Sequence, residues 1–571
     1  MKKRLPSLSS NFATIINDGG FYVDKTQFIE TLENFNQKIL FFHRPRRFGK
    51  SLLLSMIEHY YGIHHKDKFQ SLFSNYYIGK PGKTTPLCSR YYILNFNFSG
   101  IMTDSTDDIF ASFSKEVSTQ VNRFLRVYNL FDSARNYEIL KDEGAIDILR
   151  NLFSSISSLV DKPKIFILID EYDHFINELL AFKTDHFKSL VAQNGWVRKF
   201  YEVIKQYVGD GIIDRFFATG VTPVTLDSLT SGFNIAKNIT LDAQFHNMAG
   251  FTEDEVRKLI TGTIYEEGKF DLEQVVFDIR DWYNGSRFSV ETNEKLYNPQ
   301  LLVNFLTTFY YEGKYPSDMY DPSVASDYSK IRKQLSLLDI EESFSVITSI
   351  VQNENIREGI TLQYNLEDRF IKTDLVSLLF YNGLLTIGGG EGKLIDYVIP
   401  NYVVKTMYWT FLQRTLVDYN TGTFHTDELI SIFDEMRHKG KLTKLVEYIS
   451  ALMNSISNRD LRGFKESNLK MLFMPVLCFA NIYKIYSDIE VNRKYIDIYL
   501  KLQPNYNGKY SFILELKYLK QDEFEKYDEI KQNGIEQLKN YLRLENLQAD
   551  ENLKAVLIIF RNNTGEIVEV V

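Results

Sequence analysis

Cysteine is scarce in this sequence, because only Cys88 and Cys478 occur among its 571 residues. Two cysteines in distant parts of the chain exclude a disulfide framework and a cysteine-rich zinc site, so a reducing compartment is expected. Long apolar runs are lacking too: Pro475 interrupts the longest one, MLFMPVLCFA, and no apolar stretch follows the basic start MKKRLPSLSS. Neither a membrane span nor a secretion signal is supported. We expect a soluble, cytoplasmic protein with no membrane partner.

A surplus of positive charge is also absent. The 66 lysine and arginine residues are outnumbered by 74 aspartate and glutamate residues, which gives a net charge of -8. Such a chain has no global basic field for holding nucleic acid or anionic lipid, so any contact with DNA or RNA must be local. A hydrophobic content of 44% with 25% charged residues is ordinary for globular proteins and excludes disorder of the whole chain. At about 150 residues per domain, the length predicts three or four domains.

Short apolar runs alternate with helical segments from Phe21 to about Val256. This alternation predicts an α/β domain with a parallel sheet. A capping box at Thr252 and Glu255 predicts a helix that begins near Glu253 and opens a more helical middle region. The expected strands of the sheet are residues 39–42, 92–98, 165–169 and 216–219.

The region from Thr373 to Leu412 predicts a helix, a strand LLTI, the glycine run GGGEGK, a strand LIDYVI and a further helix after Pro400. This order suggests a winged helix, with the glycines at the tip of the wing because a tight hairpin needs positive φ values. The wing carries Glu391 and Lys393 rather than a basic cluster, which favours a structural or interdomain role over DNA binding.

The pattern changes again after Ile456. We expect a helical stretch to about Tyr486, then the alternating strands KYIDIYLKL and YSFILELKYL. A charged helix over residues 523–544 and a last strand, KAVLIIF, follow. Together these elements predict a compact C-terminal α/β unit.

A phosphate-binding loop is predicted within residues 38–57, KILFFHRPRRFGKSLLLSMI, where a polar loop joins a strand to an apolar helix. Gly49 would let the backbone approach the phosphates, Lys50 would reach the β- and γ-oxygens, and Ser51 would ligate Mg²⁺. Arg44 replaces the first glycine of the GxxxxGK[ST] pattern. A basic junction between loop and helix with an incidental GKS is the alternative interpretation.

The segment KIFILIDEYDHFI supplies the acidic half of such a site. Asp170 would emerge at the carboxyl end of a buried strand and hold Mg²⁺, while Glu171 would polarise the attacking water. An acidic turn that caps the next helix is the alternative, but it explains less well why Asp173 clusters with them. Thr219, at the end of another strand, would sense the γ-phosphate or orient the water; a strand that leads into a turn is equally compatible. His174 could modulate the acidic turn or be an exposed residue at a helix start.

The chain resembles the bacterial AAA-ATPase-like family whose P-loop reads RPRRFGKS and in which Arg44 at the first-glycine position is the rule. The resemblance implies a P-loop ATPase related to AAA and STAND proteins that binds ATP and Mg²⁺. It adds Arg46 and Arg47 as candidate nucleotide-binding residues, and it makes Asp24 and Lys25 candidates for nucleotide or interdomain contacts, although these two could equally form a solvated surface pair. The motifs that carry the resemblance are GFYVDKT from Gly20, RPRRFGKSLLLSM from Arg44, LIDEYD from Leu168, ATGVTPV from Ala218, GFTEDEV from Gly250, YNGSRFS from Tyr283, YNP from Tyr297, YNGLLTI from Tyr381 and IPN from Ile399.

A second candidate site lies in the C-terminal strands. Alternation in YSFILELKYL puts Glu515 and Lys517 on one face of a strand. Asp497 falls in the middle of an adjacent strand, which is an expensive place for a charge unless it is paired or coordinates a cation. The three residues match the D…ExK pattern of PD-(D/E)XK nucleases, where the acids hold Mg²⁺ and the lysine positions the attacking water.

The same bacterial family commonly ends in a nuclease-like domain of this kind. By that resemblance, Glu466 on a preceding helix and Gln537 on a following helix join Asp497, Glu515 and Lys517 as candidate catalytic residues, with Asp497 and Glu515 as metal ligands. An ordinary ExK ion pair on a strand, and a degenerate nuclease fold that only binds, are the alternatives. No other catalytic pattern competes, because the nine histidines show no HExxH or Cys/His zinc spacing.

The expected fold is a multidomain α/β protein: a P-loop NTPase domain at 1–250, a helical lid or linker at 251–345, a winged-helix-like and helical region at 346–455, and a restriction-endonuclease-like α/β domain at 456–571. The expected function is an ATPase whose conformational signal gates metal-dependent cleavage of DNA or RNA by the C-terminal domain. The alternative is a STAND-like, nucleotide-switched binding or signalling module with an inactive nuclease fold. Assembly into a homo-oligomer is left open.

Overall fold

The computed structural model divides the chain into two compact units: Met1–Gly313 with Tyr320–Tyr402, and Lys314–Met319 with Val403–Val571. No helix in the part of the chain that it describes combines the length and the apolar composition of a membrane span. The structure describes all residues except 1, 103–104, 143, 175–195, 226–232, 317–318, 320–337, 339, 366–369, 420–425, 456–463, 479–481, 492–493, 504–505, 544–551 and 571.

A five-stranded parallel sheet forms the centre of the first unit, in the order β2-β3-β4-β1-β6. All four strands that the sequence predicts are confirmed. Side chains of β3 are buried along its whole length, which explains why an uninterrupted apolar run marks this strand. The strands are β1 (Ile39–His43), β2 (Tyr92–Asn97), β3 (Ile165–Asp170), β4 (Ile213–Gly220) and β6 (Lys237–Asn238).

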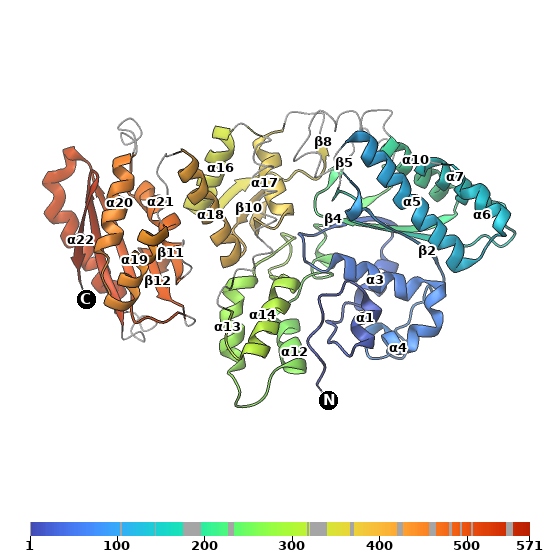
Figure 1. The fold of residues 1–571 in the computed structure, drawn as a ribbon, viewed down its shortest axis with the longest axis horizontal. Helices are drawn as coiled ribbons and strands as arrows, with labels where there is room; N and C mark the ends of the chain where they lie inside the picture. Colours follow the sequence, from blue (N-terminus) through green and yellow to red (C-terminus); the bar gives the residue numbers. More distant parts are fainter. Residues whose placement is uncertain are drawn as a thin grey trace. The chain divides into compact units, whose positions relative to one another are not determined.

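Helices cover both faces of this sheet (Figure 1). Alternating residues of β3 supply two separate cores, because Ile165, Ile167 and Ile169 pack into one while Phe166 and Leu168 pack into the other. The first core is formed with α5 (Thr106–Tyr128), α6 (Ser133–Leu140), α7 (Ala145–Ser157) and α10 (Trp196–Gly209). The second is formed with α1 (Phe12–Asn17), α2 (Gln27–Asn34), α3 (Lys50–Tyr61) and α4 (Phe69–Phe73).

The rest of the first unit is mainly helical, as predicted. The capping box of Thr252 and Glu255 is formed, and α12 begins at Glu253. A three-stranded antiparallel sheet follows in the order β7-β10-β9. Its helix–strand order is the expected one, and its identification as a winged helix stays a prediction. The elements are α12 (Glu253–Thr263), α13 (Leu272–Tyr283), α14 (Pro299–Glu312), α16 (Ile340–Asn353), β7 (Asn355–Glu358), α17 (Lys372–Tyr381), β9 (Thr386–Glu391) and β10 (Leu394–Val398), with the short parallel pair β5 (Val224–Thr225) and β8 (Tyr364–Asn365). The next helix, α18 (Tyr402–Tyr419), belongs to the second unit except for its first residue.

The predicted position of the glycine run in this small sheet is wrong. Gly388 to Gly390 lie inside β9 rather than at the hairpin tip, and only Gly392 takes a positive φ, of 63°. The run suits a crowded strand, because a Cβ on Gly388 would lie 2.8 Å from a methyl carbon of Val398. These glycines therefore permit close approach within the sheet, and the turn itself needs one glycine.

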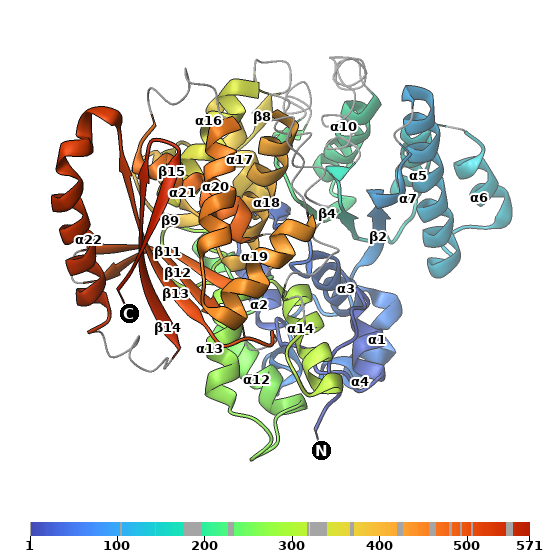
Figure 2. The ribbon, with the colours of Figure 1, turned by 60° about the vertical axis from the view of Figure 1, so that its left-hand side comes forward.

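The second unit contains a mixed five-stranded sheet in the order β11-β12-β13-β14-β15, in which only β13 and β14 are parallel. Figure 2 shows this sheet between α22 on one side and the helices α19 to α21 on the other. The elements are α19 (Thr426–Lys439), α20 (Thr443–Ser455), α21 (Glu466–Leu477), β11 (Tyr483–Val491), β12 (Lys494–Leu502), β13 (Ser511–Leu519), α22 (Tyr527–Tyr541), β14 (Leu553–Arg561) and β15 (Thr564–Glu569).

Two boundaries of the second unit differ from the sequence prediction. The expected helix to about Tyr486 ends at Leu477, and β11 begins at Tyr483. The charged helix predicted from Glu523 starts as a 3₁₀ turn, and α22 begins only at Tyr527. Short 3₁₀ turns in the chain are η1 (Ile63–Lys68), η2 (Tyr77–Gly79), η3 (Phe98–Gly100), η4 (Ala243–Phe245) and η6 (Gln521–Lys526).

Candidate functional sites

The loop between β1 and α3 has the backbone of a phosphate-binding loop. Gly49 precedes the first residue of α3 with a φ of +87°, and a Cβ there would meet no atom within 4 Å. The backbone conformation, rather than lack of space, therefore requires glycine at this position. Arg47 also has a positive φ, of 68°, a strained conformation of the kind that concentrates at functional sites.

Lys50 is buried at the start of α3, where its Nζ donates hydrogen bonds to the carbonyl oxygens of Arg44 at 3.0 Å and Pro45 at 3.1 Å. Burial lowers the pKa of the Lys50 ammonium, and the carboxylates of Asp170, Asp173 and Glu171 oppose that shift. The lysine of the loop and the acidic turn after β3 thus belong to one electrostatic site.

Arg44, which replaces the usual first glycine, does not face solvent. Its guanidinium is buried between the rings of Phe42 and Phe288, with its central carbon 4.4 and 4.1 Å from the ring centroids. Four carbonyl oxygens accept its hydrogen bonds, at 2.8 to 3.1 Å, and burial lowers its pKa to about 9. Arg44 therefore fastens the loop to the chain after β6, a role that sequence reasoning missed. The accepting carbonyls belong to His43, Thr240, Phe245 and His246.

The acidic turn begins where β3 ends. Asp170 is buried, and its Oδ1 accepts a hydrogen bond of 2.8 Å from the hydroxyl of Thr219 at the corresponding end of β4. Glu171 follows in a left-handed conformation, with a φ of 52°, and its carboxylate lies 3.4 Å from Nδ1 of His174. A strained residue that carries a carboxylate at a sheet edge is typical of a functional turn.

Asp173 has a structural role in this turn. It is buried, and its Oδ2 accepts hydrogen bonds from the backbone of Val221 and Thr222. The adjacent Tyr172 contacts Nε2 of His43 at 2.7 Å through its hydroxyl. Burial lowers the pKa of His43 to about 4, so this imidazole is neutral near pH 7. These contacts hold the acidic turn against β1 and the segment after β4.

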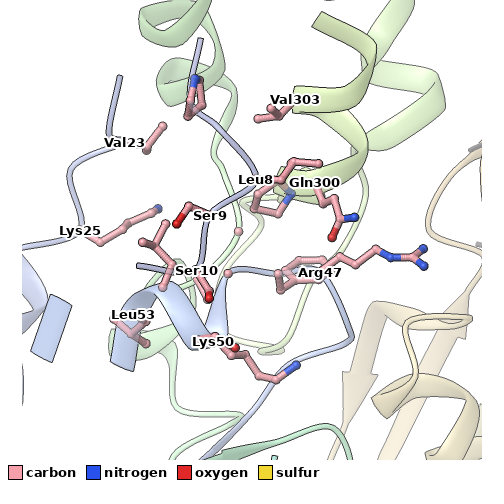
Figure 3. Close-up of a pocket in the computed structure, with 18 of the residues that line it drawn as sticks. Leu8, Ser9, Ser10, Val23, Lys25, Arg47, Lys50, Leu53, Gln300 and Val303 are labelled. Carbon is pink, nitrogen blue, oxygen red and sulfur yellow. The ribbon is translucent and has the colours of Figure 1, made fainter. Parts of the chain in front are cut away.

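A cavity of about 550 Å³ opens beside the loop, large enough for a nucleotide (Figure 3). Figure 3 shows Ser9 and Ser10 of the N-terminal segment across from Gln300 and Val303 of α14, with Lys50 at one end. Of the predicted site residues that the structure describes, those lining the cavity are Arg46, Arg47, Gly49, Lys50, Ser51 and Glu171, whereas Asp170 and Thr219 are buried without lining it.

Segments distant in sequence brace the same loop. The Nδ2 of Asn298, the N-cap of α14, donates to the carbonyl oxygen of Arg46 at 3.2 Å. A Cβ on Gly383 would lie 2.9 Å from Pro45, and one on Gly250 would lie 3.1 Å from the ring of Phe48. One hydrogen bond and two close approaches therefore join the loop to the helical part of its unit.

Lys25 is buried and Asp24 is half-buried, and both bind other parts of the unit rather than forming a solvated surface pair. Nζ of Lys25 lies 2.7 and 2.8 Å from the two carboxylate oxygens of Glu255 and donates to the carbonyl oxygen of Asn247 at 2.8 Å. Asp24 accepts hydrogen bonds from the backbone nitrogens of Thr26 and Tyr77. The pair thus connects the N-terminal segment to α12 and to the chain before it, and Lys25 also lines the cavity.

The second predicted cluster is assembled on β12 and β13. Their antiparallel pairing ends at Ile498 and Leu514, and next to it Oδ2 of Asp497 accepts a 2.7 Å hydrogen bond from the backbone of Leu516. Lys517 Nζ is 2.8 Å from Oε1 of Glu515 and 3.3 Å from Oε1 of Glu466 at the start of α21. Four of the five predicted side chains therefore converge.

Glu515 is the most buried member of this cluster, with 2% of its side chain exposed. Its Oε1 pairs with Lys517, whereas its Oε2 is shielded from solvent and has no hydrogen-bond partner in the part of the chain that the structure describes. Burial raises the pKa of Glu515 to about 7; the charge of Asp497 adds to the shift and Lys517 opposes it. Burial also raises the pKa of Glu466. Although burial acts against its charge, the neighbouring carboxylates raise the pKa of Lys517.

Gln537 stands apart from the other four. It is half-buried on α22, which packs on β13 and β14, and it makes no hydrogen bond to the described residues of the cluster. Tyr541, one turn further along α22, is buried, and burial together with the charges of Glu515 and Asp497 raises its pKa to about 12. Tyr541 is thus a neighbour of the acids that sequence reasoning missed.

Comparisons with known proteins match two regions of the chain to domain families. Residues 8–230 match a family described as Predicted AAA-ATPase, and residues 464–570 match the PD-(D/E)XK nuclease superfamily. A curated protein of Azotobacter chroococcum mcd 1, described as an uncharacterized protein in the vnfD 5' region, is 26% identical over 310 residues, or 53% of this chain and 52% of that protein. The chain therefore spans about half the length of this curated relative. The chain joins a predicted AAA-ATPase domain to a C-terminal domain of the PD-(D/E)XK nuclease superfamily.

Proposed function

We propose that the N-terminal domain binds ATP with Mg²⁺ and hydrolyses it, and that the C-terminal domain cleaves phosphodiester bonds in DNA or RNA. The observation that carries the first part is the 550 Å³ cavity, which brings the GKS sequence together with Glu171 of the acidic turn. The C-terminal part is carried by the convergence of Asp497, Glu515 and Lys517.

Phosphate binding is assigned to the loop and the start of α3. Backbone N–H groups at this helix N-terminus favour an anion, and Gly49 has the φ value that lets the chain turn around it. Lys50 would exchange its bonds to two carbonyl oxygens for bonds to phosphate oxygens. Arg46 and Arg47 line the same cavity and supply further positive charge.

The residues on the acidic side suit a magnesium ion, which prefers oxygen ligands. Ser51 would supply a hydroxyl from α3, and Asp170 a carboxylate directly or through water. Thr219 holds Oδ1 of that carboxylate and leaves Oδ2 for other contacts. Glu171, which lines the cavity, would accept a proton from the attacking water, and bound Mg²⁺ would neutralise charge on the phosphates.

The C-terminal cluster also fits a divalent cation. Oε2 of Glu515 is a shielded carboxylate oxygen without a hydrogen-bond partner among the described residues, and such an atom is costly to bury unless a ligand satisfies it. Asp497 lies close enough to raise the pKa of Glu515. These two residues would hold Mg²⁺, while Lys517 would position the attacking water and Glu466 would hold Lys517 in place. Gln537 is kept as a candidate for orienting substrate.

Two paired assays test the proposal on the full chain: phosphate release from ATP, and cleavage of plasmid DNA and of RNA with Mg²⁺ or Mn²⁺. Lys50→Ala and Glu171→Gln should abolish ATP hydrolysis, and Glu515→Ala should abolish cleavage while ATP hydrolysis continues. The exposed residues Lys115 and Glu525 provide matched controls as Lys115→Ala and Glu525→Gln. Hydrolysis by Lys50→Ala at the parent rate would disprove the nucleotide site.

Control of cleavage by ATP is part of the proposal. A Lys50→Ala chain should lose nucleotide-dependent cleavage even though its C-terminal cluster is intact. If the parent releases phosphate but cuts neither DNA nor RNA, the C-terminal domain only binds, and the chain is a nucleotide-switched module. The net charge of -8 favours that second candidate, because binding a duplex requires several phosphate contacts.

A further inference from the structure

A group of histidines lies where α3 ends, one full helix length from the phosphate-binding loop. The chain turns at Gly62 between α3 and η1, and this turn places His64 and His65 next to Glu58 of the last helical turns. One ligand-type atom from each of the three residues lies within 4.8 Å of the other two. Sequence spacing alone does not indicate this group, because a glutamate six residues before two adjacent histidines is no common metal motif.

Hydrogen bonds from other elements orient two of these side chains. Nδ2 of Asn95, on β2, donates to Oε2 of Glu58 at 3.0 Å. The hydroxyl of Tyr128, at the end of α5, lies 2.9 Å from Nδ1 of His64, and the same hydroxyl accepts the backbone N–H of Ile93 at 2.8 Å. Contacts of this kind to the far side of a histidine or carboxylate are characteristic of metal ligands, because they hold the ligand atom in position.

His65 provides a second and independent observation. Its Nδ1 is shielded from solvent and has no hydrogen-bond partner in the described part of the chain. The ring stacks on His59, with centroids 4.1 Å apart, and the ring of His64 follows with its centroid 3.8 Å from that of His65. An unpartnered buried nitrogen is costly to retain. Imidazole nitrogens are common metal ligands, and a bound ion would satisfy this atom.

From this geometry we propose that Glu58, His64 and His65 form a binding site for a divalent transition metal, such as Zn²⁺, that prefers imidazole and carboxylate ligands. Zinc binds such nitrogen and oxygen atoms at about 2.0–2.2 Å, so ligand atoms on one ion lie roughly 3–4 Å apart. The present spacing of up to 4.8 Å is wider, so the side chains must move together when the ion binds. Three protein ligands leave a fourth position for water.

Nearby positive charges would oppose the binding of a cation at this site. Arg123 lies 4.0 Å from Oε1 of Glu58, but 63% of its side chain is exposed, so it can move into solvent when a cation binds. Burial lowers the pKa of His65 most, followed by the charges of His59 and His64, and those of Lys68 and Arg123 act in the same direction. His59 is no ligand through its Nδ1, which contacts the carbonyl oxygen of Ser55 at 2.7 Å. The bound ion would join the end of α3 to η1, and the proposal does not depend on ATP hydrolysis.

The test is metal binding to the full chain after removal of metals with a chelator. Co²⁺ serves as the probe, because four-coordinate Co²⁺ with nitrogen ligands absorbs strongly in the visible range, whereas octahedral Co²⁺ bound by oxygen absorbs weakly. The parent should bind one more equivalent of Co²⁺ than His64→Asn/His65→Asn, and its visible absorption should disappear in that variant. Zn²⁺ should displace the Co²⁺ and bleach the absorption.

Two controls separate this site from others. Glu515→Gln removes a ligand of the C-terminal acidic cluster and should leave the visible absorption unchanged, as should His438→Asn on the exposed surface of α19. Equal stoichiometry and equal absorption in the parent and in the double histidine variant would overturn the proposal, as would absorption that disappears in Glu515→Gln. Glu58→Gln should weaken binding at least tenfold, and it decides the question if the double variant does not fold.

Discussion

The hydroxyl of Thr219 donates to Oδ1 of Asp170 over 2.8 Å, and this bond joins the carboxyl ends of two adjacent parallel strands. Both side chains are buried, so water does not compete for the bond. Thr219 therefore fixes one oxygen of the carboxylate that we assign to magnesium, and contact with nucleotide is not needed to explain its position. The residue acts through Asp170, as a positioning residue.

Thr219→Val should test this role, because valine keeps the shape of threonine and removes the donor. The change leaves a buried carboxylate oxygen without its partner, at a cost of about 1–3 kcal/mol in the free energy of unfolding. It should also raise the Mg²⁺ concentration that ATP hydrolysis requires. Thr219→Ser retains a hydroxyl and should resemble the parent in a Mg²⁺ titration of phosphate release. An identical Mg²⁺ dependence in the valine and serine variants would contradict the assignment.

Arg44→Gly should destabilise the protein even though it restores the usual P-loop glycine. The guanidinium donates to four carbonyl oxygens, and each hydrogen bond to a charged group contributes about 1.5–3 kcal/mol, with losses that are not additive. We expect a loss of at least about 3 kcal/mol in denaturant unfolding and weaker binding of ATP. Arg44→Lys keeps the charge but loses the planar guanidinium, so its free energy of unfolding should lie between those of the parent and Arg44→Gly.

Arg47→Gly is the matched control for Arg44→Gly in the unfolding experiment. Arg47 has a φ of 68°, which glycine adopts without strain, and its side chain extends away from the other labelled residues in Figure 3. Because glycine also adds freedom to the unfolded chain, its effect on the free energy of unfolding should stay within about 1 kcal/mol, well below that of Arg44→Gly. Equal losses of stability in the two glycine variants would contradict the stabilising role that we assign to the hydrogen bonds of Arg44.

Local pattern was enough to predict the main sheet and the central residues of both clusters, whereas Glu466 and Gln537 came from the family resemblance. Buried parallel strands such as β3 carry continuous apolar runs, and polar residues at their ends meet at one edge, so Asp170 and Thr219 could be placed together from sequence. Period-2 alternation on β13 placed Glu515 and Lys517 on one face in the same way, and the two side chains form an ion pair. These are features that neighbouring residues determine.

Features that depend on distant partners could not be predicted. Three of the four carbonyl oxygens that hold Arg44 follow it by about 200 residues, and no local signal links them to it. The strand β11 is an edge strand that is formed by pairing with β12, so its sequence was mistaken for the end of a helix. The group of Glu58, His64 and His65 exists because a turn at Gly62 folds η1 back on α3. Tertiary packing, rather than propensity, decides each case.

The ion pair of Lys25 and Glu255 should be strongly coupled. Lys25 is buried with 8% of its side chain exposed, and Glu255 also accepts the backbone N–H of Thr252 in the capping box. Removing one partner leaves the other charge uncompensated, so Lys25→Met and Glu255→Gln should each cost about 3–5 kcal/mol in unfolding experiments.

The double variant of Lys25 and Glu255 decides whether that loss comes from the pair. We expect each single change to act mainly by leaving the other charge buried without a partner. In that case Lys25→Met/Glu255→Gln should lower the free energy of unfolding by clearly less than the sum of the single changes, with a difference of about 1 kcal/mol or more. Simple additivity would mean that the two side chains stabilise the N-terminal segment independently, through Asn247 and the capping box.

The acidity of Glu515 makes the stability of the C-terminal domain dependent on pH. Burial raises the pKa of this carboxyl to about 7, compared with about 4.3 in an unfolded chain. Between these values the folded state binds a proton that the unfolded state has lost, so stability decreases as pH rises from about 4.5 to about 7 and stays lower above that. At about 1.4 kcal/mol per pKa unit, the full effect is about 4 kcal/mol at most.

Glu515→Gln should remove most of this pH dependence, because glutamine carries no proton that is lost in this range. The unfolding free energy of the variant should exceed that of the parent by an amount that grows between about pH 4.5 and 7 and then levels off. Burial also raises the pKa of Glu466, so the unfolding free energy of the variant should still decrease slightly as pH rises. Urea unfolding of both proteins over this pH range measures the difference, and parallel curves for parent and variant would rule out the assigned pKa.

Divalent metal should reverse the destabilisation that ionised Glu515 causes. A cation binds the ionised carboxylate and satisfies the shielded Oε2, whereas at low pH it must displace a proton first. The rise in melting temperature on addition of Mn²⁺ should therefore be small near pH 5.5, increase through about pH 7, and be absent in Glu515→Gln at every pH. A shift of the same size at all pH values would place the metal elsewhere, because the raised pKa of Glu515 makes binding to this carboxylate depend on pH.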